Sequence, residues 1–447
     1  MNYLIGLDIG TSSIKGVLMT QDGEIIKTAR GGFHYTKLAG GGLEIQAEDF
    51  ASVCLMTIKE LATAADGNIC GVCASSASGN LVVVDKDGKA STPIYNWQDT
   101  RVTTEAKEVL GEMDLDAFYR KVGWPFAYQT FPLALACYVK VHEPEKIKNA
   151  GMVTMSTEYL YYRLTGKWGI SSSAGTPFYF IDQESGTYIP ELLEALEITE
   201  ERLPPILPCG SVLGGVLPEM EEISGLPAGT PVILGSFDHP SAARGVGVFH
   251  EGEMLLSCGT SWVGFFPIAD REKAASAGLL IDPFLAPKGG CWGTMVSVAS
   301  VSERIWLYVS RYIDSSENAY KLLSELAAKA EPGAGGLSIC PTDEPDDAKV
   351  AGYSKEQIAR AIMEGTVYLL KAQLDRLSAI GIKASSAVMV GGPSENPMWL
   401  SLIEDICGVT GKIIHGAHAG SVGAAMLAGI GAGLYKNEAE ANAICNK

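Results

Sequence analysis

The chain has 447 residues, a formal net charge of −18 and 47% hydrophobic residues. An acidic chain binds nucleic acid and anionic membranes poorly, so we expect neither as a partner. The length exceeds what one hydrophobic core usually supports and predicts two domains. No apolar run approaches the ~20 residues of a membrane span, and no basic leader precedes the first predicted strand, so we expect a cytoplasmic protein. The ten scattered cysteines fit reduced thiols.

The first half of the chain is predicted to alternate strands and helices. The predicted elements are a three-stranded meander over 3–29, a helix over 47–64, strands near 69–74 and 81–84, a mostly helical segment over 103–186 and a strand over 231–234. A second meander begins at Glu253. We therefore expect an N-terminal domain over 1–246 and a C-terminal domain over 247–447.

The last third of the chain has the clearest pattern. Apolar residues recur at helical spacing over 358–380, and a strand over 387–390 then ends in two glycines. Asn396 before a proline is a good helix N-cap. A short strand over 412–415 and a helix of small residues from 421 complete an α/β pattern. Glycines at a strand end let a flat ligand approach the backbone, as in other α/β folds.

The triplet Gly-Thr-Ser occurs twice, at 10–12 and at 259–261, each time between two apolar strands. A tight glycine turn offers backbone N–H groups and hydroxyls to a phosphate. Two such turns suggest a duplicated fold that holds a polyphosphate. The alternative is two unrelated hairpins, because these residues are common in turns for conformational reasons.

Asp8 lies on the first predicted strand, just before the first turn, and Lys15 lies on the returning strand. A carboxylate beside bound phosphate is favourable when a divalent cation lies between them, and Mg²⁺ is the usual one. The lysine could reach a phosphate as a point charge. In the alternative interpretation, Asp8 caps its own turn.

Asp238 follows a predicted strand and precedes a predicted helix. A carboxylate there could take the proton from a substrate hydroxyl as the oxygen attacks phosphorus. A helix N-cap explains the same residue nearly as well. The segment Trp97-Gln98-Asp99-Thr100-Arg101 has a similar ambiguity, because it suits either a polyol site or a buried tryptophan beside a surface ion pair.

Taken together in their order along the chain, these residues resemble the FGGY family of carbohydrate kinases, which includes xylulokinase, gluconokinase and glycerol kinase. The resemblance covers nearly the whole chain. It rests on the segments 6–12, 97–101, 158–160, 164–166, 257–261, 391–392 and 423–425, together with Asp238 and Trp399. It implies an α/β fold of two actin-like (ribonuclease H-like) lobes with an active site in the interlobe cleft. It also implies ATP and Mg²⁺ as cofactors.

The resemblance implies a role for each matching residue. Asp238 would be the catalytic base, and Asp8 would orient the metal. The implied nucleotide-binding residues are Thr11, Ser12, Lys15, Gly259, Thr260, Gly391, Gly392 and Asn396. The implied substrate-binding residues are Ser78, Gly79, Trp97, Asp99, Arg101, Asp238 and His239.

Several segments depart from the family pattern. The loop 77–80 reads Ala-Ser-Gly-Asn where xylulokinases usually carry Met-His and glycerol kinases carry Arg-Glu, and the second family signature is abbreviated around 341–353. We expect a ketose of the xylulose type as acceptor, with a polyol or sugar acid (glycerol or gluconate) as the alternative. A non-catalytic sugar or nucleotide sensor and an actin-like ATPase are further alternatives on this fold. The expected partners are ATP and the sugar, and the sequence leaves open whether the protein forms a homodimer.

Overall fold

The computed structural model describes all 447 residues, which form two compact units. The first unit comprises Met1–Gly247, Ala274–Trp292 and His418–Lys447, and the second comprises Val248–Lys273 and Gly293–Ala417. The chain first changes unit close to the expected boundary at 246/247, but two later segments belong to the first unit. The two units are therefore not the two continuous stretches expected from the sequence.

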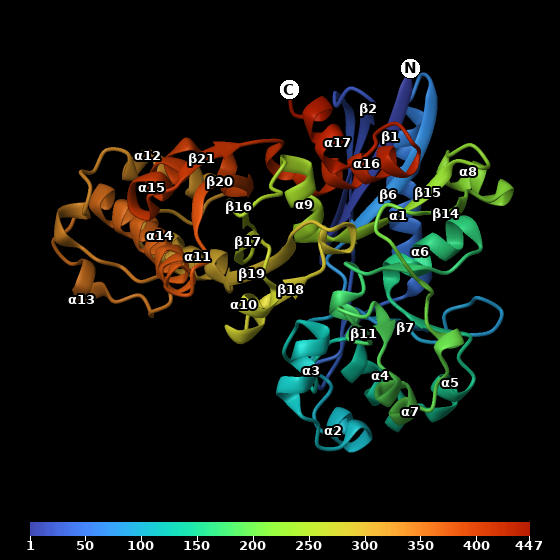
Figure 1. Ribbon diagram of the computed structural model, residues 1–447. Coiled ribbons are helices and arrows are strands. Elements are labelled where there is room, and N and C mark those ends of the chain that lie inside the picture. The colour runs from blue at the N-terminus through green and yellow to red at the C-terminus, as the bar shows by residue number, and fades with distance from the viewer. The chain divides into compact units, whose positions relative to one another are not determined.

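The first unit is built on a six-stranded sheet with the order β14-β15-β6-β1-β2-β3 (Figure 1). Its strands are β1 (Asn2–Ile9), β2 (Ser13–Thr20), β3 (Ile25–Gly32), β6 (Asn68–Ser76), β14 (Val212–Gly215) and β15 (Pro231–Phe237). The central strands β1, β6 and β15 run parallel to one another. Their carboxyl ends therefore meet at one edge of the sheet, the usual place for a site in an α/β fold.

Helices cover both faces of this sheet. Alternate residues of β1 enter different cores: Ile5 packs in the core that contains residues of α1 (Ala47–Thr63), and Leu4 packs in the core that contains residues of α16 (Ala419–Gly431). The second helix approaches the strand closely, because a Cβ on Gly6 would lie 1.9 Å from the carbonyl oxygen of Ser421. This burial explains why a late segment of the chain belongs to the first unit.

The segment expected to be mostly helical contains short strands as well. Its helices are α2 (Glu105–Leu110), α3 (Leu115–Val122), α4 (Pro132–His142), α5 (Pro144–Lys148) and α6 (Ser156–Thr165). Its strands are β9 (Met152–Thr154), β10 (Ile170–Ser171) and β11 (Ile181–Asp182). β9 and β10 pair with distant segments, at 82–84 and 206–207, so the local pattern does not show them, and β11 forms a short hairpin with 187–188.

The first unit contains several further elements. Its other strands are β4 (Thr36–Lys37), β5 (Leu43–Ile45), β7 (Val82–Val84), β8 (Ile94–Tyr95), β12 (Thr187–Tyr188), β13 (Ile206–Leu207) and β18 (Leu280–Asp282). Its other helices are α7 (Pro190–Leu196), α8 (Glu221–Ser224), α9 (Asp238–Val246) and α17 (Glu438–Cys445), and α10 (Arg271–Ser276) spans a change of unit.

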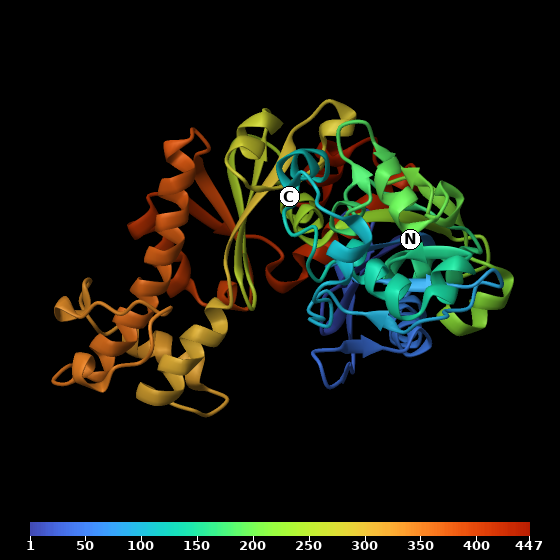
Figure 2. The ribbon, with the colours of Figure 1, turned by 90° about the horizontal axis from the view of Figure 1, so that it is seen from below.

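The second unit contains five strands of a six-stranded sheet, in the order β19-β17-β16-β20-β21. The strands are β16 (Gly252–Cys258), β17 (Trp262–Ile268), β19 (Trp292–Val298), β20 (Ala384–Gly391) and β21 (Thr410–Ile413). The helices are α11 (Val301–Tyr312), α12 (Ala319–Ala327), α13 (Asp347–Val350), α14 (Lys355–Ala379) and α15 (Pro397–Cys407). The long orange helix of Figure 2 is α14, and it confirms the helix predicted over 358–380. No helix in either unit is both long and apolar enough to span a membrane.

Candidate functional site

The first Gly-Thr-Ser turn joins β1 to β2 at the sheet edge where the parallel strands end. Gly10 N donates to Ser13 O at 2.9 Å and closes the turn. Asp8 and Lys15 are direct cross-strand partners in this hairpin. Opposite residues of an antiparallel pair project from the same face of the sheet, so the carboxylate and the ammonium group lie on one face beside the turn.

The electrostatic surroundings of Asp8 disfavour its charge. Burial and, to a lesser extent, the charge of Asp238 raise the pKa of the carboxyl from 3.8 to about 6, against the opposing effect of Lys15. The carboxylate also lies against α16, because a Cβ on Gly420 would be 2.8 Å from both Cγ and Oδ2 of Asp8. A cation beside the two carboxylates would relieve this unfavourable charge.

Asp238 lies at the end of β15 and is the first residue of α9. Phe237 takes the N-cap position, so Asp238 is not the cap of this helix. The Asp238 side chain keeps 27% of its surface exposed, and His239 N donates to its Oδ1 at 2.7 Å. His239 Nε2 lies 3.9 Å from the same oxygen. The carboxylate is therefore fixed by the backbone and remains open to a ligand.

The proposed sugar residue Trp97 contacts the first turn directly. Its indole Nε1 donates to the hydroxyl of Thr11 at 2.9 Å. The loop after β6 lies beside it, since a Cβ on Gly79 would be 3.3 Å from the Trp97 Cβ and 3.1 Å from Phe131 Cδ1. The buried Ser78 (φ 49°) and Gly79 (φ 74°) both have left-handed backbones. The structure therefore brings the loop 77–80, Trp97 and the first turn together.

Asp99 and Arg101 form an internal network. Asp99 is fully buried, and its Oδ2 accepts from Leu43 N at 2.8 Å. Its Oδ1 accepts from both the backbone N and Nε of Arg101, at 3.0 Å and 2.9 Å. The guanidinium also pairs with Glu44 at 2.7 Å. These contacts occupy the polar atoms of Asp99, so the two residues hold the Trp97 segment in place.

In the second unit, hydrogen bonds join the second Gly-Thr-Ser turn to the start of α11. Ser302 N donates to Thr260 O at 3.1 Å, and Ser302 Oγ donates to Gly259 O at 2.6 Å. Ser300 N donates to Ser261 Oγ at 3.0 Å. The turn and the amino terminus of a twelve-residue helix thus lie side by side. Helix N-termini attract anions through their free N–H groups and their dipole.

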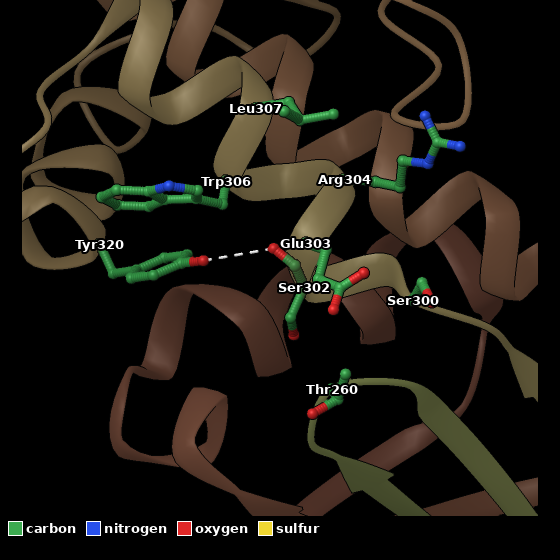
Figure 3. Close-up of a pocket in the computed structure, with 8 residues that line it drawn as sticks. All are labelled: Thr260, Ser300, Ser302, Glu303, Arg304, Trp306, Leu307 and Tyr320. Carbon is green, nitrogen blue, oxygen red and sulfur yellow. Dashed lines mark hydrogen bonds between the residues drawn. The ribbon is translucent and has the colours of Figure 1, made fainter. Parts of the chain in front are cut away.

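A pocket of about 620 Å³ opens beside this turn (Figure 3). It is lined by Thr260, Ser300, Ser302, Glu303, Arg304, Trp306, Leu307 and Tyr320. The rings of Trp306 and Tyr320 lie 5.8 Å apart, and the Tyr320 hydroxyl donates to Ser302 O at 3.3 Å. A polar end beside the turn and an aromatic end on α11 and α12 suit a nucleotide.

The glycines after β20 lie at the same edge of the second sheet as the second turn. Cys258 and Gly391 are register partners in the parallel pair of β16 and β20. Gly391 has φ +94°, and a Cβ there would lie 2.3 Å from Cys258 O, so only glycine fits. Gly392 has no heavy atom within 4 Å of its ideal Cβ position. Asn396 caps α15 by accepting from Met398 N at 3.0 Å, which confirms the predicted N-cap.

No sequence motif marks the serines and aromatic residues of the pocket. Ser300, Ser302 and Trp306 belong to no motif that was singled out, and Tyr320 comes from a separate helix. The only sequence signal is a pair of serines at the start of an amphipathic helix. The predicted residues Ser12 and Lys15 lie at the first turn, where the Ser12 side chain is exposed and Lys15 is half-buried.

Comparisons with known proteins identify the family. Residues 3–245 match the N-terminal domain of the FGGY family of carbohydrate kinases, and residues 325–432 match its C-terminal domain. Xylulose kinase from Bacillus subtilis (strain 168) is 26% identical, over 98% of this chain and 90% of its own length. Autoinducer-2 kinase from Yersinia pestis (strain Pestoides F) is 26% identical, over 97% of this chain and 87% of its own length. The crystal structure of xylulose kinase from Rhodospirillum rubrum superposes with a TM-score of 0.83 at 25% identity, covering 96% of this chain and 90% of that one.

These matches confirm the expected α/β fold of two actin-like domains, each with its own sheet. They also confirm the expected enzyme class, a phosphotransferase with an alcohol group as acceptor. The match to the N-terminal domain covers the first Gly-Thr-Ser turn and residues of the strands on either side of it. The match to the C-terminal domain covers the glycines after β20. The chain belongs to the FGGY family of carbohydrate kinases.

Proposed function

We propose that this kinase transfers the γ-phosphoryl group of ATP to a hydroxyl of a ketose of the xylulose type. The proposal rests on the sheet edge of the first unit, where β1 supplies Asp8 and the first turn and β15 leads into Asp238. A relative named xylulose kinase, 26% identical over almost the whole chain, supports this acceptor class.

In the proposed reaction, Asp238 acts as the general base. Its carboxylate accepts the proton of the acceptor hydroxyl while that oxygen forms a bond to the γ-phosphorus and the bond to ADP breaks. The partial exposure of the side chain gives the hydroxyl access. Positioning and charge neutralisation contribute most of the rate in phosphoryl transfer, and the base contributes a smaller factor.

We assign Mg²⁺ to the side of the sheet edge where Asp8 lies. No group of three or more His, Cys, Asp or Glu side chains in the chain could hold a metal ion by itself. Mg²⁺ usually binds proteins through one or two carboxylates and takes its other ligands from water and phosphate, so Asp8, with Asp238 nearby, fits it. When bound, the ion neutralises phosphate charge. Lys15, the cross-strand partner of Asp8, would add a second positive charge.

We assign phosphate binding to each of the two Gly-Thr-Ser turns, and we assign the nucleoside of ATP to the pocket beside α11. Thr11 and Ser12 supply hydroxyls at the first turn, and Gly259 and Thr260 form the second turn. The fastening of the second turn to a helix N-terminus supports an anion there. Gly392 leaves open space beside the backbone for a flat group, Gly391 allows the close approach to Cys258, and the Asn396 side chain caps the next helix.

We assign the acceptor to the surface formed by Trp97, Ser78, Gly79 and His239. The indole would face the sugar while its N–H holds Thr11. We assign Asp99 and Arg101 to positioning Trp97, because their charged groups are already paired.

A panel of acceptors tests the proposal. Purified protein is incubated with ATP, Mg²⁺ and either D-xylulose, gluconate, glycerol or autoinducer-2, and ADP formation and the melting shift are measured. We expect D-xylulose to give the largest specificity constant. Asp238→Asn is expected to lower kcat by about 10²-fold, the usual size of a general-base contribution, with ATP binding retained. The matched control Asp405→Asn removes an exposed carboxylate and should leave kcat unchanged.

The other outcomes identify the alternatives. Preference for glycerol or gluconate would make the chain a polyol or sugar-acid kinase. Melting shifts with a sugar but no ADP formation would indicate a sensor, and ADP formation that no acceptor stimulates would indicate an actin-like ATPase. Unchanged turnover in Asp238→Asn would exclude Asp238 as the base.

A further inference from the structure

A buried series of hydrogen bonds ends at the peptide group between Ser236 and Phe237, one residue before Asp238. Phe237 N donates to Ser173 Oγ at 3.2 Å, and Ser173 Oγ in turn donates to Asp282 Oδ2 at 2.8 Å. Ser173 is 1% exposed and Asp282 is fully buried. The resemblance to the family assigned no role to these two residues, which are 109 positions apart in the sequence.

Asp282 is well placed to fix this series of hydrogen bonds at its other end. Phe284 N donates to its Oδ1 at 2.7 Å, so both carboxylate oxygens have partners. Burial raises the pKa of Asp282 to about 6, although the hydrogen bonds from Phe284 and Ser173 and the charge of Arg244 oppose this shift. The Ser173 hydroxyl donates to this carboxyl group, which leaves the lone pairs of its oxygen for Phe237 N–H.

Arg244 holds the same segment from the other side. This buried residue of α9 donates through one terminal nitrogen to Ser236 Oγ at 3.4 Å and to Pro240 O at 3.2 Å, so it contacts the residues on both sides of Asp238. Its other terminal nitrogen donates to Phe284 O at 3.0 Å. The segment around Asp238 and the loop after β18 are therefore tied together twice.

We propose that Ser173 and Asp282 are positioning residues that set the place of Asp238, an inference that rests on the proposed function of that carboxylate. β15 ends at Phe237, and the peptide orientation there decides where the first side chain of α9 points. Without Ser173, Phe237 N–H would be a buried donor with no partner, and the peptide would rotate to find one. A displacement of the base by about 1 Å can cost about 10²-fold in rate.

Kinetics and hydrogen exchange on the full chain test the inference. Ser173→Ala and Asp282→Asn are expected to lower kcat by about 10-fold or more with little change in KM for ATP, since neither residue touches the nucleotide turns. Hydrogen exchange at the Phe237 amide should become faster in both. The matched control is Ser224→Ala, which removes another buried serine hydroxyl of the first unit, one that donates to Met220 O. It should leave kcat unchanged.

A double-mutant cycle separates positioning from general structural damage. In the Asp238→Asn background, Ser173→Ala should cause less than about a twofold further loss, because residues that act through one another are not additive. Equal losses in both backgrounds, or wild-type kcat in Ser173→Ala while Asp238→Asn is impaired, would overturn the inference alone. Wild-type kcat in Asp238→Asn would overturn the proposed base and the inference with it. If no acceptor gives turnover, the proposed function fails, and an unchanged Phe237 exchange rate would still overturn the positioning.

Discussion

The indole N–H of Trp97 donates a 2.9 Å hydrogen bond to the hydroxyl of Thr11, and so links the surface proposed to bind the acceptor to the first Gly-Thr-Ser turn. The two residues are 86 positions apart in the sequence. The link means that a group packed against the indole also acts on the turn. Acceptor binding and phosphate binding are thus expected to be coupled through one hydrogen bond within the first unit.

Trp97→Phe tests this coupling, because it keeps an aromatic ring and removes the N–H. A hydrogen bond contributes roughly 1 kcal/mol net, so we expect kcat/KM for the acceptor to fall about fivefold. Thr11→Val should give a similar loss, and Thr11→Ser, which keeps the acceptor oxygen, should retain activity. Losses of the Trp97→Phe and Thr11→Val variants that simply multiply in the double variant would contradict the coupling.

Gly420→Ala tests the crowding at Asp8. The added Cβ would lie 2.8 Å from the Asp8 carboxylate, closer than side chains pack, so the carboxylate or α16 must move. We expect kcat to fall about tenfold or more and the Mg²⁺ concentration for half-maximal activity to rise. The control is Gly32→Ala, where no heavy atom lies within 4 Å of the new Cβ. Wild-type Mg²⁺ dependence in Gly420→Ala would mean that Asp8 does not position the ion.

Ser302→Ala tests the fastening of the second turn. The substitution removes the 2.6 Å hydrogen bond to Gly259 O. We expect KM for ATP to rise about fivefold, the equivalent of one hydrogen bond, with KM for the acceptor unchanged. Ser310→Ala is the control on the same helix, since that hydroxyl donates only within α11, to Trp306 O and Leu307 O. An equal rise in both variants would point to helix damage instead.

The pH dependence of stability is predicted to depend on Glu158, which is 1% exposed and whose Oε2 has no hydrogen-bond partner. Burial raises the pKa of this carboxyl from 4.5 to about 8. Between these values the folded state binds more protons than the unfolded chain, so the free energy of unfolding falls as pH rises. One such group changes it by at most about 1.4 kcal/mol per pH unit.

Glu158→Gln removes this contribution because the amide does not titrate. The melting temperature of the variant relative to the wild type should therefore increase between about pH 5 and about pH 8. Glu219→Gln, at an exposed position, should show no such trend. A difference for Glu158→Gln that is constant across this range would contradict an uncharged Glu158 in the folded protein.

Local patterns predicted the elements whose signals lie within one segment. The apolar spacing over 358–380 and the Asn396 cap required no distant partner, and α14 and α15 follow them closely. The choice between a sugar site and an ion pair at Trp97–Arg101 could not be made in the same way. The partners of Asp99 and Arg101, Leu43 and Glu44, lie more than fifty positions away, and only the fold brings them together.

No local sequence pattern indicated that Ala274–Trp292 and His418–Lys447 belong to the first unit. A helix of small residues is compatible with many neighbours, and only the close approach of Ser421 to Gly6 shows which strand it covers. Ser173 and Asp282 were missed for a related reason, because each is an ordinary polar residue until a contact places it behind Phe237.

The packing of α16 on β1 also determines when the first sheet can be completed during synthesis on the ribosome. The hydrogen bond from Ser421 Oγ to Lys15 O joins residues 406 positions apart. At ordinary rates of synthesis, the strand waits roughly 20 to 80 s for the helix that covers it. During that interval the apolar face of the nascent sheet is open to chaperones and to other chains, first with Leu4 and, once β15 has been made, also with Ile233. Slow translation should therefore favour aggregation of this protein, and an early-arriving holdase should protect it.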